Sequence, residues 1–218
     1  MTFSCDVQDL LLARGDFGFE TQRIPLPQVL RVVILCGAVH GLVMGAHSGS
    51  ILQMLLSACK VPMLIMISTC LCLPSLFMLA TVGGLRDDLR GIVRAVFASQ
   101  ATVAVTLCQL APLLIVFYVS TNNYEAIKAF NAGLFLLASI AGQVTLQKHY
   151  AVLVRRDPRH VWGQRVWLVL YILVTIQLAW LLRPFIGSPG MDVQIFRESA
   201  WGNAYVELLQ SLVRALSS

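Results

Sequence analysis

Long apolar runs separated by short polar stretches dominate the sequence. A bilayer core is about 30 Å thick, and a helix needs roughly 20 residues to cross it. Five runs approach or exceed this length, over residues 29–46, 61–82, 91–119, 124–146 and 166–182. Lipid offers no hydrogen-bond partners, so each spanning segment is expected to be helical. The pattern predicts an all-α, polytopic transmembrane bundle of about five spans.

The polar stretches divide the chain into three parts. Residues 1–28 are mixed in character and are predicted to form an N-terminal segment outside the membrane, followed by a transmembrane domain over 29–186. Residues 187–218 form a tail, in which apolar positions between Trp201 and Leu216 recur at helical spacing. This spacing predicts a C-terminal amphipathic helix that lies on the membrane surface or packs on a partner.

The interval between the first two runs, residues 50–60, is apolar but too short to span. It is compatible with an interfacial segment, a re-entrant segment or an N-terminal extension of the second helix. Pro62 suits the first turn of a helix, because its missing N–H is not needed there. Lys60 is then predicted to lie at a membrane surface, with its ammonium group in water.

Composition and charge agree with a membrane location. Hydrophobic residues make up 57% of the chain and charged residues 12%, whereas soluble domains carry about 25% charged residues. The net charge of +5 does not indicate nucleic-acid binding, because the basic residues lie in short loops between the apolar runs.

The distribution of basic residues predicts orientation. Eleven belong to the N-terminal segment and to the loops around 86–94 and 148–165, and five lie on the other side. The positive-inside rule therefore predicts a cytoplasmic N-terminus and an extracytoplasmic C-terminus. The expected location is the inner (cytoplasmic) membrane of a bacterium.

The sharpest motif is a glycine stripe in the first span. Its members recur every four residues at Gly37, Gly41, Gly45 and Gly49. Small residues on one face of an apolar helix allow another backbone to approach closely. The stripe predicts a helix-packing face, and a neighbour within the same chain is favoured over one from another chain.

Three polar side chains share one face of the third span, namely Thr102, Thr106 and Gln109. They are compatible with a polar path for a substrate or an ion. They are also typical of hydrogen bonding between helices, and this reading is favoured because the middle of the span has no acid or base.

Cys36 and His40 lie one turn apart in the first span. An ionisable group inside a membrane suggests a metal site or a proton relay. Two residues do not complete a zinc site, so a neutral histidine bonded to a backbone carbonyl or to another helix is favoured. Catalytic and phosphate-binding motifs are missing, and no catalytic residue, metal or cofactor is predicted.

Arg155, Arg156 and Arg159 concentrate positive charge in the loop before the last span. They are candidates for binding anionic lipid headgroups or an acidic partner. Orientation alone requires charge there as well, and the two interpretations stay open.

Part of the chain resembles the Yip1-type membrane proteins. The resemblance is carried by the stretch from Leu73-Pro74-Ser75 through the loop at 83–90, and by Gln109-Leu110-Ala111-Pro112 in the next span. Arg183-Pro184-Phe185 is similar to uncharacterised bacterial membrane proteins with that sequence after the last span. The glycine stripe and the long tail differ from the first family. The resemblance implies a helical bundle without known catalysis.

The leading hypothesis is a non-enzymatic membrane subunit or scaffold that organises partner proteins or the bilayer. Its expected partners are membrane lipids and other membrane protein subunits. The alternative is a small transporter or channel that uses the polar face of the third span. A membrane enzyme would require acids and bases to converge, for which Asp87, Asp88, His149 and His160 are the candidates.

Overall fold

The computed structural model describes residues 26–121, 123–182 and 185–187. The described residues form five long helices, a single 3-10 turn and no strand. The elements are α2 (Leu26–Ala46), α3 (Ile51–Val82), η2 (Arg86–Asp88), α4 (Leu89–Ser120), α5 (Tyr124–Arg156) and α6 (His160–Leu181). Each of the five is long and apolar enough to cross a membrane. This confirms the predicted all-helical, five-span bundle. The predicted amphipathic helix over 201–216 lies outside the described residues.

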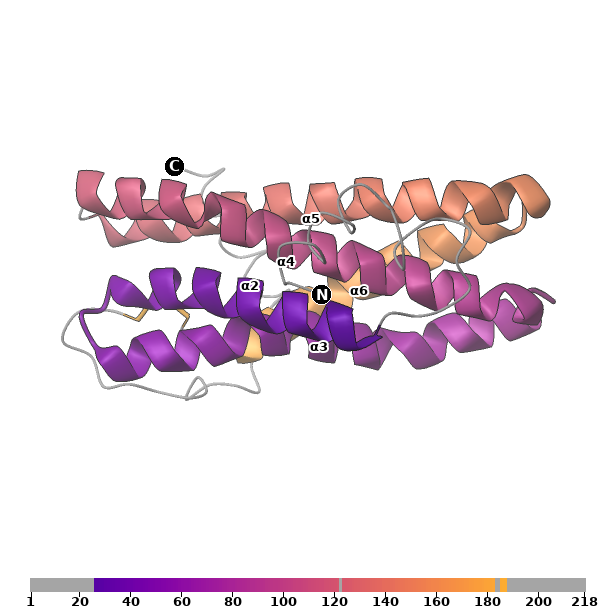
Figure 1. Cartoon of the computed structure of the whole chain (residues 1–218), viewed down its shortest axis with the longest axis horizontal. Helices are drawn as coiled ribbons and strands as arrows, with labels where there is room; N and C mark the ends of the chain where they lie inside the picture. Colours follow the sequence, from indigo (N-terminus) through magenta and orange to yellow (C-terminus); the bar gives the residue numbers. More distant parts are fainter. Residues whose placement is uncertain (1–25, 122, 183–184, 188–218) are drawn as a thin grey trace, which may run out of the picture.

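Successive helices run in opposite directions along the bundle (Figure 1). The end of α2 and the end of α4 lie at one end of the bundle, and the connections 83–88 and 157–159 lie at the other. The helices α3, α4 and α5 contain 32 or 33 residues, which corresponds to about 50 Å at 1.5 Å per residue. Because a bilayer core is about 30 Å thick, these three helices extend beyond it.

The second span begins earlier than predicted. Residues 51–60 are the first turns of α3, which settles the three alternatives in favour of an extension of the second helix. Pro62 lies inside α3 instead of in its first turn. The prediction that Lys60 reaches a membrane surface was also wrong, since Lys60 is 3% exposed. Its place within a continuous helix that packs on α2 accounts for the burial.

The contact between α2 and α3 is made through glycine. A Cβ atom on Gly41 would lie 2.7 Å from the carbonyl carbon of Ser57, and one on Gly45 would lie 2.7 Å from the Cα of Met54. A Cβ on Gly37 would lie 3.3 Å from the ring of Pro62. The two backbones therefore touch, and the neighbour of the stripe belongs to the same chain.

Gly49 does not share this packing role. The helix α2 ends at Ala46, and Gly49 lies in the connection to α3 with a φ of 70°. Nothing lies within 4 Å of a Cβ at this position. Its requirement is conformational, because side-chain residues rarely adopt this region of φ. The four-residue spacing continues past the end of the helix, which is why the sequence assigned Gly49 to the stripe.

A second small-residue contact joins α4 and α5. Gly142 of α5 faces α4, where a Cβ would lie 2.5 Å from Cγ2 of Val103 and 3.1 Å from the carbonyl oxygen of Ser99. Ala138, one turn earlier, is fully buried. The pairs α2–α3 and α4–α5 are thus held by close backbone approach, and buried residues of α2 and α4, among them Val33 and Ala101, belong to one core.

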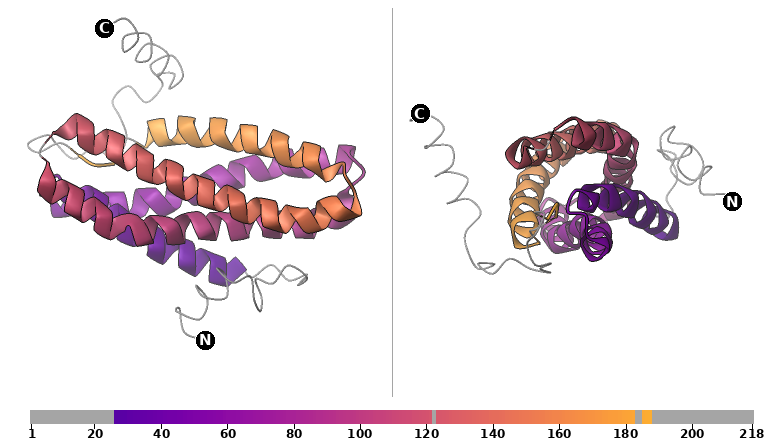
Figure 2. Two further views of the ribbon diagram at one scale, coloured as in Figure 1. Left: turned by 90° about the horizontal axis from the view of Figure 1, so that it is seen from above. Right: turned by 90° about the vertical axis from the view of Figure 1, so that its left-hand side faces the viewer.

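The helix α6 lies at the edge of the bundle, on the side away from α2 (Figure 2). Trp167 and Tyr171 are among the side chains that join it to the bundle. Trp167 is buried and stacks on Tyr171 with ring centroids 4.9 Å apart. The Tyr171 hydroxyl donates to the side-chain oxygen of Gln100 on α4 at 2.8 Å. Of the 22 residues of α6, only His160, Trp167 and Trp180 are buried.

Gly41→Ala tests the backbone contact. The added methyl group meets backbone atoms of Ser57 and Ala58, so we expect a loss of about 1–3 kcal/mol in the free energy of unfolding. The measurement is reversible unfolding in bicelles followed by helical circular dichroism. Gly133→Ala is the matched control, because a Cβ at Gly133 of α5 meets nothing within 4 Å. Equal stability of the two variants would contradict the packing described.

Candidate functional site

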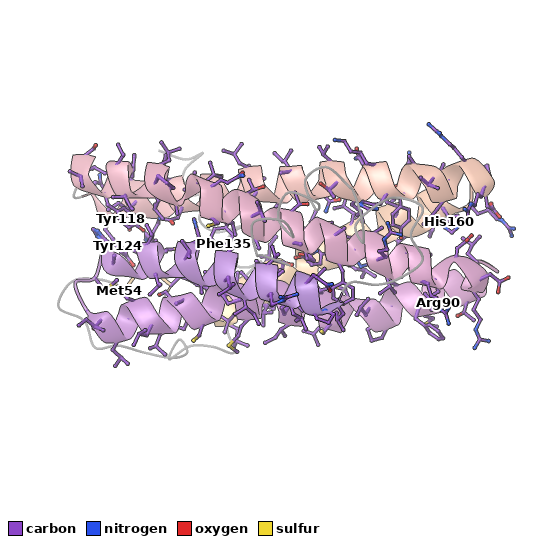
Figure 3. The ribbon with its side chains drawn as sticks, viewed as in Figure 1. Met54, Arg90, Tyr118, Tyr124, Phe135 and His160 are labelled. Carbon is purple, nitrogen blue, oxygen red and sulfur yellow. The ribbon has the colours of Figure 1, made fainter. Side chains whose placement is uncertain are left out.

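Positive charge is concentrated at one end of the bundle. The segments 83–94 and 148–165 contain eight basic and three acidic residues, a net charge of +5. The basic residues are Arg86, Arg90, Arg94, Lys148, Arg155, Arg156, Arg159 and Arg165. At the opposite end, segments 47–60 and 117–128 contain Lys60, Lys128 and Glu125, a net charge of +1. We call the first of these the basic end. Figure 3 shows Arg90 and His160 there, far from Tyr118 and Tyr124.

Two connections meet at the basic end through Asp88 and His160. The Nε2–H of His160 donates to Oδ2 of Asp88 at 3.0 Å, and a guanidinium nitrogen of Arg156 lies 3.8 Å from Oδ1 of the same carboxylate. The His160 side chain is 1% exposed and packs edge-on against Tyr150. Asp88 therefore ties the start of α4 to the end of α5 and the start of α6.

Asp157 and Arg159 shape the turn between α5 and α6. Asp157 accepts hydrogen bonds from the backbone N–H of Arg159 at 2.9 Å and from its guanidinium group at 2.7 Å. These bonds hold the pKa of the Asp157 carboxyl below its usual value. Nη1 of Arg159 also donates to the carbonyl oxygen of Gly83 at 3.3 Å, so the turn is joined to the α3–α4 connection.

A cavity of about 230 Å³ lies beside these contacts. Its buried lining comes from α3, α4, α5 and α6 and from the α3–α4 connection, and comprises Leu76, Ala80, Leu85, Ile92, Tyr150 and His160. Its exposed lining includes Val82, Arg159 and Trp162. The buried side chains form the floor and the exposed ones form the rim. The cavity is therefore apolar inside, with a cation at its opening.

The three arginines singled out in the sequence differ in their surroundings. Arg155, Arg156 and Arg159 are all exposed. Arg159 alone among them lines the cavity, whereas Arg156 faces Asp88. Arg156 and Arg159 therefore both lie beside the α3–α4 connection, Arg156 near Asp88 and Arg159 at Gly83.

The predicted polar path in α4 is not continuous. The hydroxyl of Thr102 donates to the carbonyl oxygen of Ala98, and the hydroxyl of Thr106 donates to that of Thr102. Both side chains thus bond to their own helix, as is common for threonine in apolar helices. Gln109 is exposed on the side of the bundle. None of the three lines the cavity at the basic end.

His40 joins α2 to α4. Its Nδ1 lies 2.9 Å from the carbonyl oxygen of Leu107. A carbonyl only accepts hydrogen bonds, so Nδ1 carries the proton. The ring packs edge-on against Phe135 with centroids 5.5 Å apart. This is the carbonyl-bonded arrangement that the sequence favoured for His40. In the described part of the chain, no group of three or more His, Cys, Asp or Glu side chains is placed to hold a metal ion.

Sequence reasoning missed two interior polar features. Arg94 was treated as a loop residue, yet it lies in α4, is 5% exposed, and has Nε and Nη2 buried without a hydrogen-bond partner. Gln53 and Ser57 of α3 donate to the carbonyl oxygen of Phe185, which secures the chain after α6. Side chains far apart in sequence make these contacts, and hydropathy carries no signal for them.

These features define a helical membrane protein with one strongly basic end. Comparison of the chain with models of known protein families, with curated proteins and with solved structures finds no match. The resemblance to the Yip1-type proteins rests on the sequence stretches given above.

Asp88→Asn tests the tie at the basic end. The buried His160 ring then loses its anionic partner, and we expect a loss of about 1–3 kcal/mol in the free energy of unfolding. Asp87→Asn, at an exposed neighbouring position, removes the same charge and is the matched control. If both variants unfold at the same denaturant concentration in bicelles, the Asp88–His160 hydrogen bond contributes nothing to stability.

Proposed function

We propose that the protein is a non-enzymatic integral membrane subunit that holds another membrane protein against α6. The observation that carries this proposal is the uneven burial of the helices. In α2, nine of 21 residues are buried, whereas in α6 three of 22 are. The remaining residues of α6 are all partly or fully exposed, and a helix that is anchored in this way offers a surface for a further transmembrane helix.

The geometry of α6 supports this use. Trp167 belongs to a buried cluster shared with α3, α4 and α5, and Tyr171 donates to Gln100 of α4. Val169 and Ile172 are exposed on the remaining surface. Lipid tails are as apolar as these side chains, so the exposed surface gains from a partner through packing and not through the hydrophobic effect. A preformed, fixed helix face lowers the ordering cost of such packing.

A non-enzymatic role agrees with the acid–base groups at the basic end. Asp88 and His160 are bonded to each other, and His160 is almost fully enclosed. His149 lies near the positive charge of Arg94. The bond between Asp88 and His160 and the enclosure of His160 favour structural roles for these two residues.

The transporter alternative depends on the polar face of α4. It is supported by the exposure of Gln109 and by the buried polar side chains Ser99 and Gln100. It is weakened by the bonding of the Thr102 and Thr106 hydroxyls to their own helix. A reconstituted flux that disappears in Gln109→Leu would favour this alternative.

We infer that the basic end faces the cytoplasm of a bacterial cell and that the protein lies in the inner membrane. The support is the charge difference of +5 against +1 between the two ends. The start of α2 points towards the basic end (Figure 1), which supports a cytoplasmic N-terminus.

Site-specific photo-cross-linking tests the α6 proposal. A photoreactive phenylalanine derivative replaces Val169 or Ile172, both exposed on α6. We expect each to cross-link one defined membrane protein, which also copurifies at fixed stoichiometry in mild detergent.

Leu71 of α3 and Val144 of α5 are the matched controls. Both are exposed, and like Ile172 they lie about three turns from the basic end. They should not give the same product. Cross-linking from all positions alike, or a strictly monomeric protein without an associated chain, would count against the proposal.

A further inference from the structure

We propose that the cavity at the basic end binds one acyl chain of an anionic phospholipid, whose phosphate group lies against Arg159. The cavity lies between the start of α6 and the ends of the neighbouring helices. It is separate from the exposed α6 residues that carry the proposed partner contact. The proposal is argued from the size, depth and charge of the cavity.

Size and lining favour a single chain. Pockets for drug-sized ligands have volumes of roughly 300–1,000 Å³, and this cavity is smaller, at about 230 Å³. Its floor includes Leu76, Ala80 and Ile92, each at most 5% exposed. An apolar floor of this size suits part of one hydrocarbon chain, because its methylene groups gain dispersion contacts with the buried side chains there.

The rim lies at the depth where lipid headgroups are found. Trp162 is 71% exposed and Val82 is 81% exposed. Met78, one turn before Val82, is also exposed. Tryptophan is enriched at membrane–water interfaces, and exposed valine and methionine beside it indicate that lipid reaches this level. A chain that enters the cavity from the rim keeps its headgroup at the interface.

Charge favours an anionic headgroup. The guanidinium group of Arg159 has five N–H donors. The Nε–H and one Nη2–H bond to Asp157, and one Nη1–H bonds to Gly83. Two donors are left for a phosphate oxygen. The surrounding segments add a net charge of +5, which attracts an anionic lipid more strongly than a zwitterionic one.

The test is a titration of the purified full-length protein with phosphatidylglycerol or phosphatidylcholine that carries brominated acyl chains. Bromine quenches nearby tryptophan, and Trp162 lines the cavity rim. We expect saturable quenching that is lost in Trp162→Phe, with phosphatidylglycerol bound at least about fivefold more tightly, as one arginine contact at the surface implies.

Gly163→Leu tests the chain site. Gly163 lines the cavity, and a Cβ there meets nothing within 4 Å, so a leucine fits the helix and occupies cavity space. We expect the affinity for both lipids to fall about tenfold, because several buried methylene groups are displaced. Gly133→Leu, at an equally open position outside the cavity, should leave both affinities unchanged.

Arg159→Gln tests the headgroup contact. We expect it to lower the affinity for phosphatidylglycerol about fivefold and that for phosphatidylcholine by less, because the choline group offsets the charge of the phosphate. Arg155→Gln removes the same charge from an exposed residue that does not line the cavity, and it should have less effect.

Three outcomes would overturn the proposal. Unchanged affinity in Gly163→Leu would show that no chain enters the cavity. Equal effects of Arg155→Gln and Arg159→Gln would show a diffuse surface charge and no headgroup site. Displacement of the brominated lipid by glycerol phosphate alone, at the concentration of the lipid, would show an anion site without a chain.

Discussion

At Gly41 and Gly45 the backbone of α2 lies directly on the backbone of α3, with no room for a Cβ atom on either glycine. Lipid tails are as apolar as leucine, so the hydrophobic effect does not drive helices together within a bilayer. Close approach replaces it with dispersion contacts between backbones. The rest of the arrangement depends on this contact. It fixes α2 on α3 and leaves another face of α2 for α4, where His40 bonds to the carbonyl oxygen of Leu107.

The same constraint explains why α6 has fewer fully buried residues than α2. The helices α2 to α5 form pairs through small residues, and the two pairs meet along α2 and α4. No comparable small-residue contact holds α6 in the described structure, since a Cβ on Gly163, its one glycine, meets nothing within 4 Å. Its contacts include the buried Trp167 and the hydrogen bond from Tyr171 to Gln100 of α4. The space beside its first turns becomes the cavity at the basic end.

The number and type of the elements followed from hydropathy, but the helix ends did not. The length of an apolar run reflects only the part of a helix that lies within the lipid. The helices α3 and α5 are longer than their apolar runs and continue through polar residues such as Gln53 and Arg155. Their extensions are stabilised by packing on neighbours and by solvent beyond the lipid, which a count of apolar residues does not include. The spacing of Gly37, Gly41 and Gly45 revealed a packing face, yet spacing alone did not show that α2 ends before Gly49.

The candidate site was foreseen only in part. Charge indicated the basic end, and Asp88 and His160 were among the residues considered for a meeting point. Their contact joins residues 72 positions apart. It depends on how the α3–α4 hairpin is aligned with the α5–α6 hairpin. The burial of Arg94 and the cavity beside Ile92 arise from the same alignment. Local sequence carries no information about either.

Thiol accessibility tests the central claim of a five-span bundle with one basic end most directly. Single cysteines are placed at Asp87, Pro158, Ser48 and Thr121 in a chain whose six native cysteines are replaced, and a membrane-impermeant maleimide is applied to sealed vesicles of each orientation. Positions 87 and 158 should react from one side of the membrane, and positions 48 and 121 from the other. Labelling of 87 and 158 from opposite sides would contradict the account.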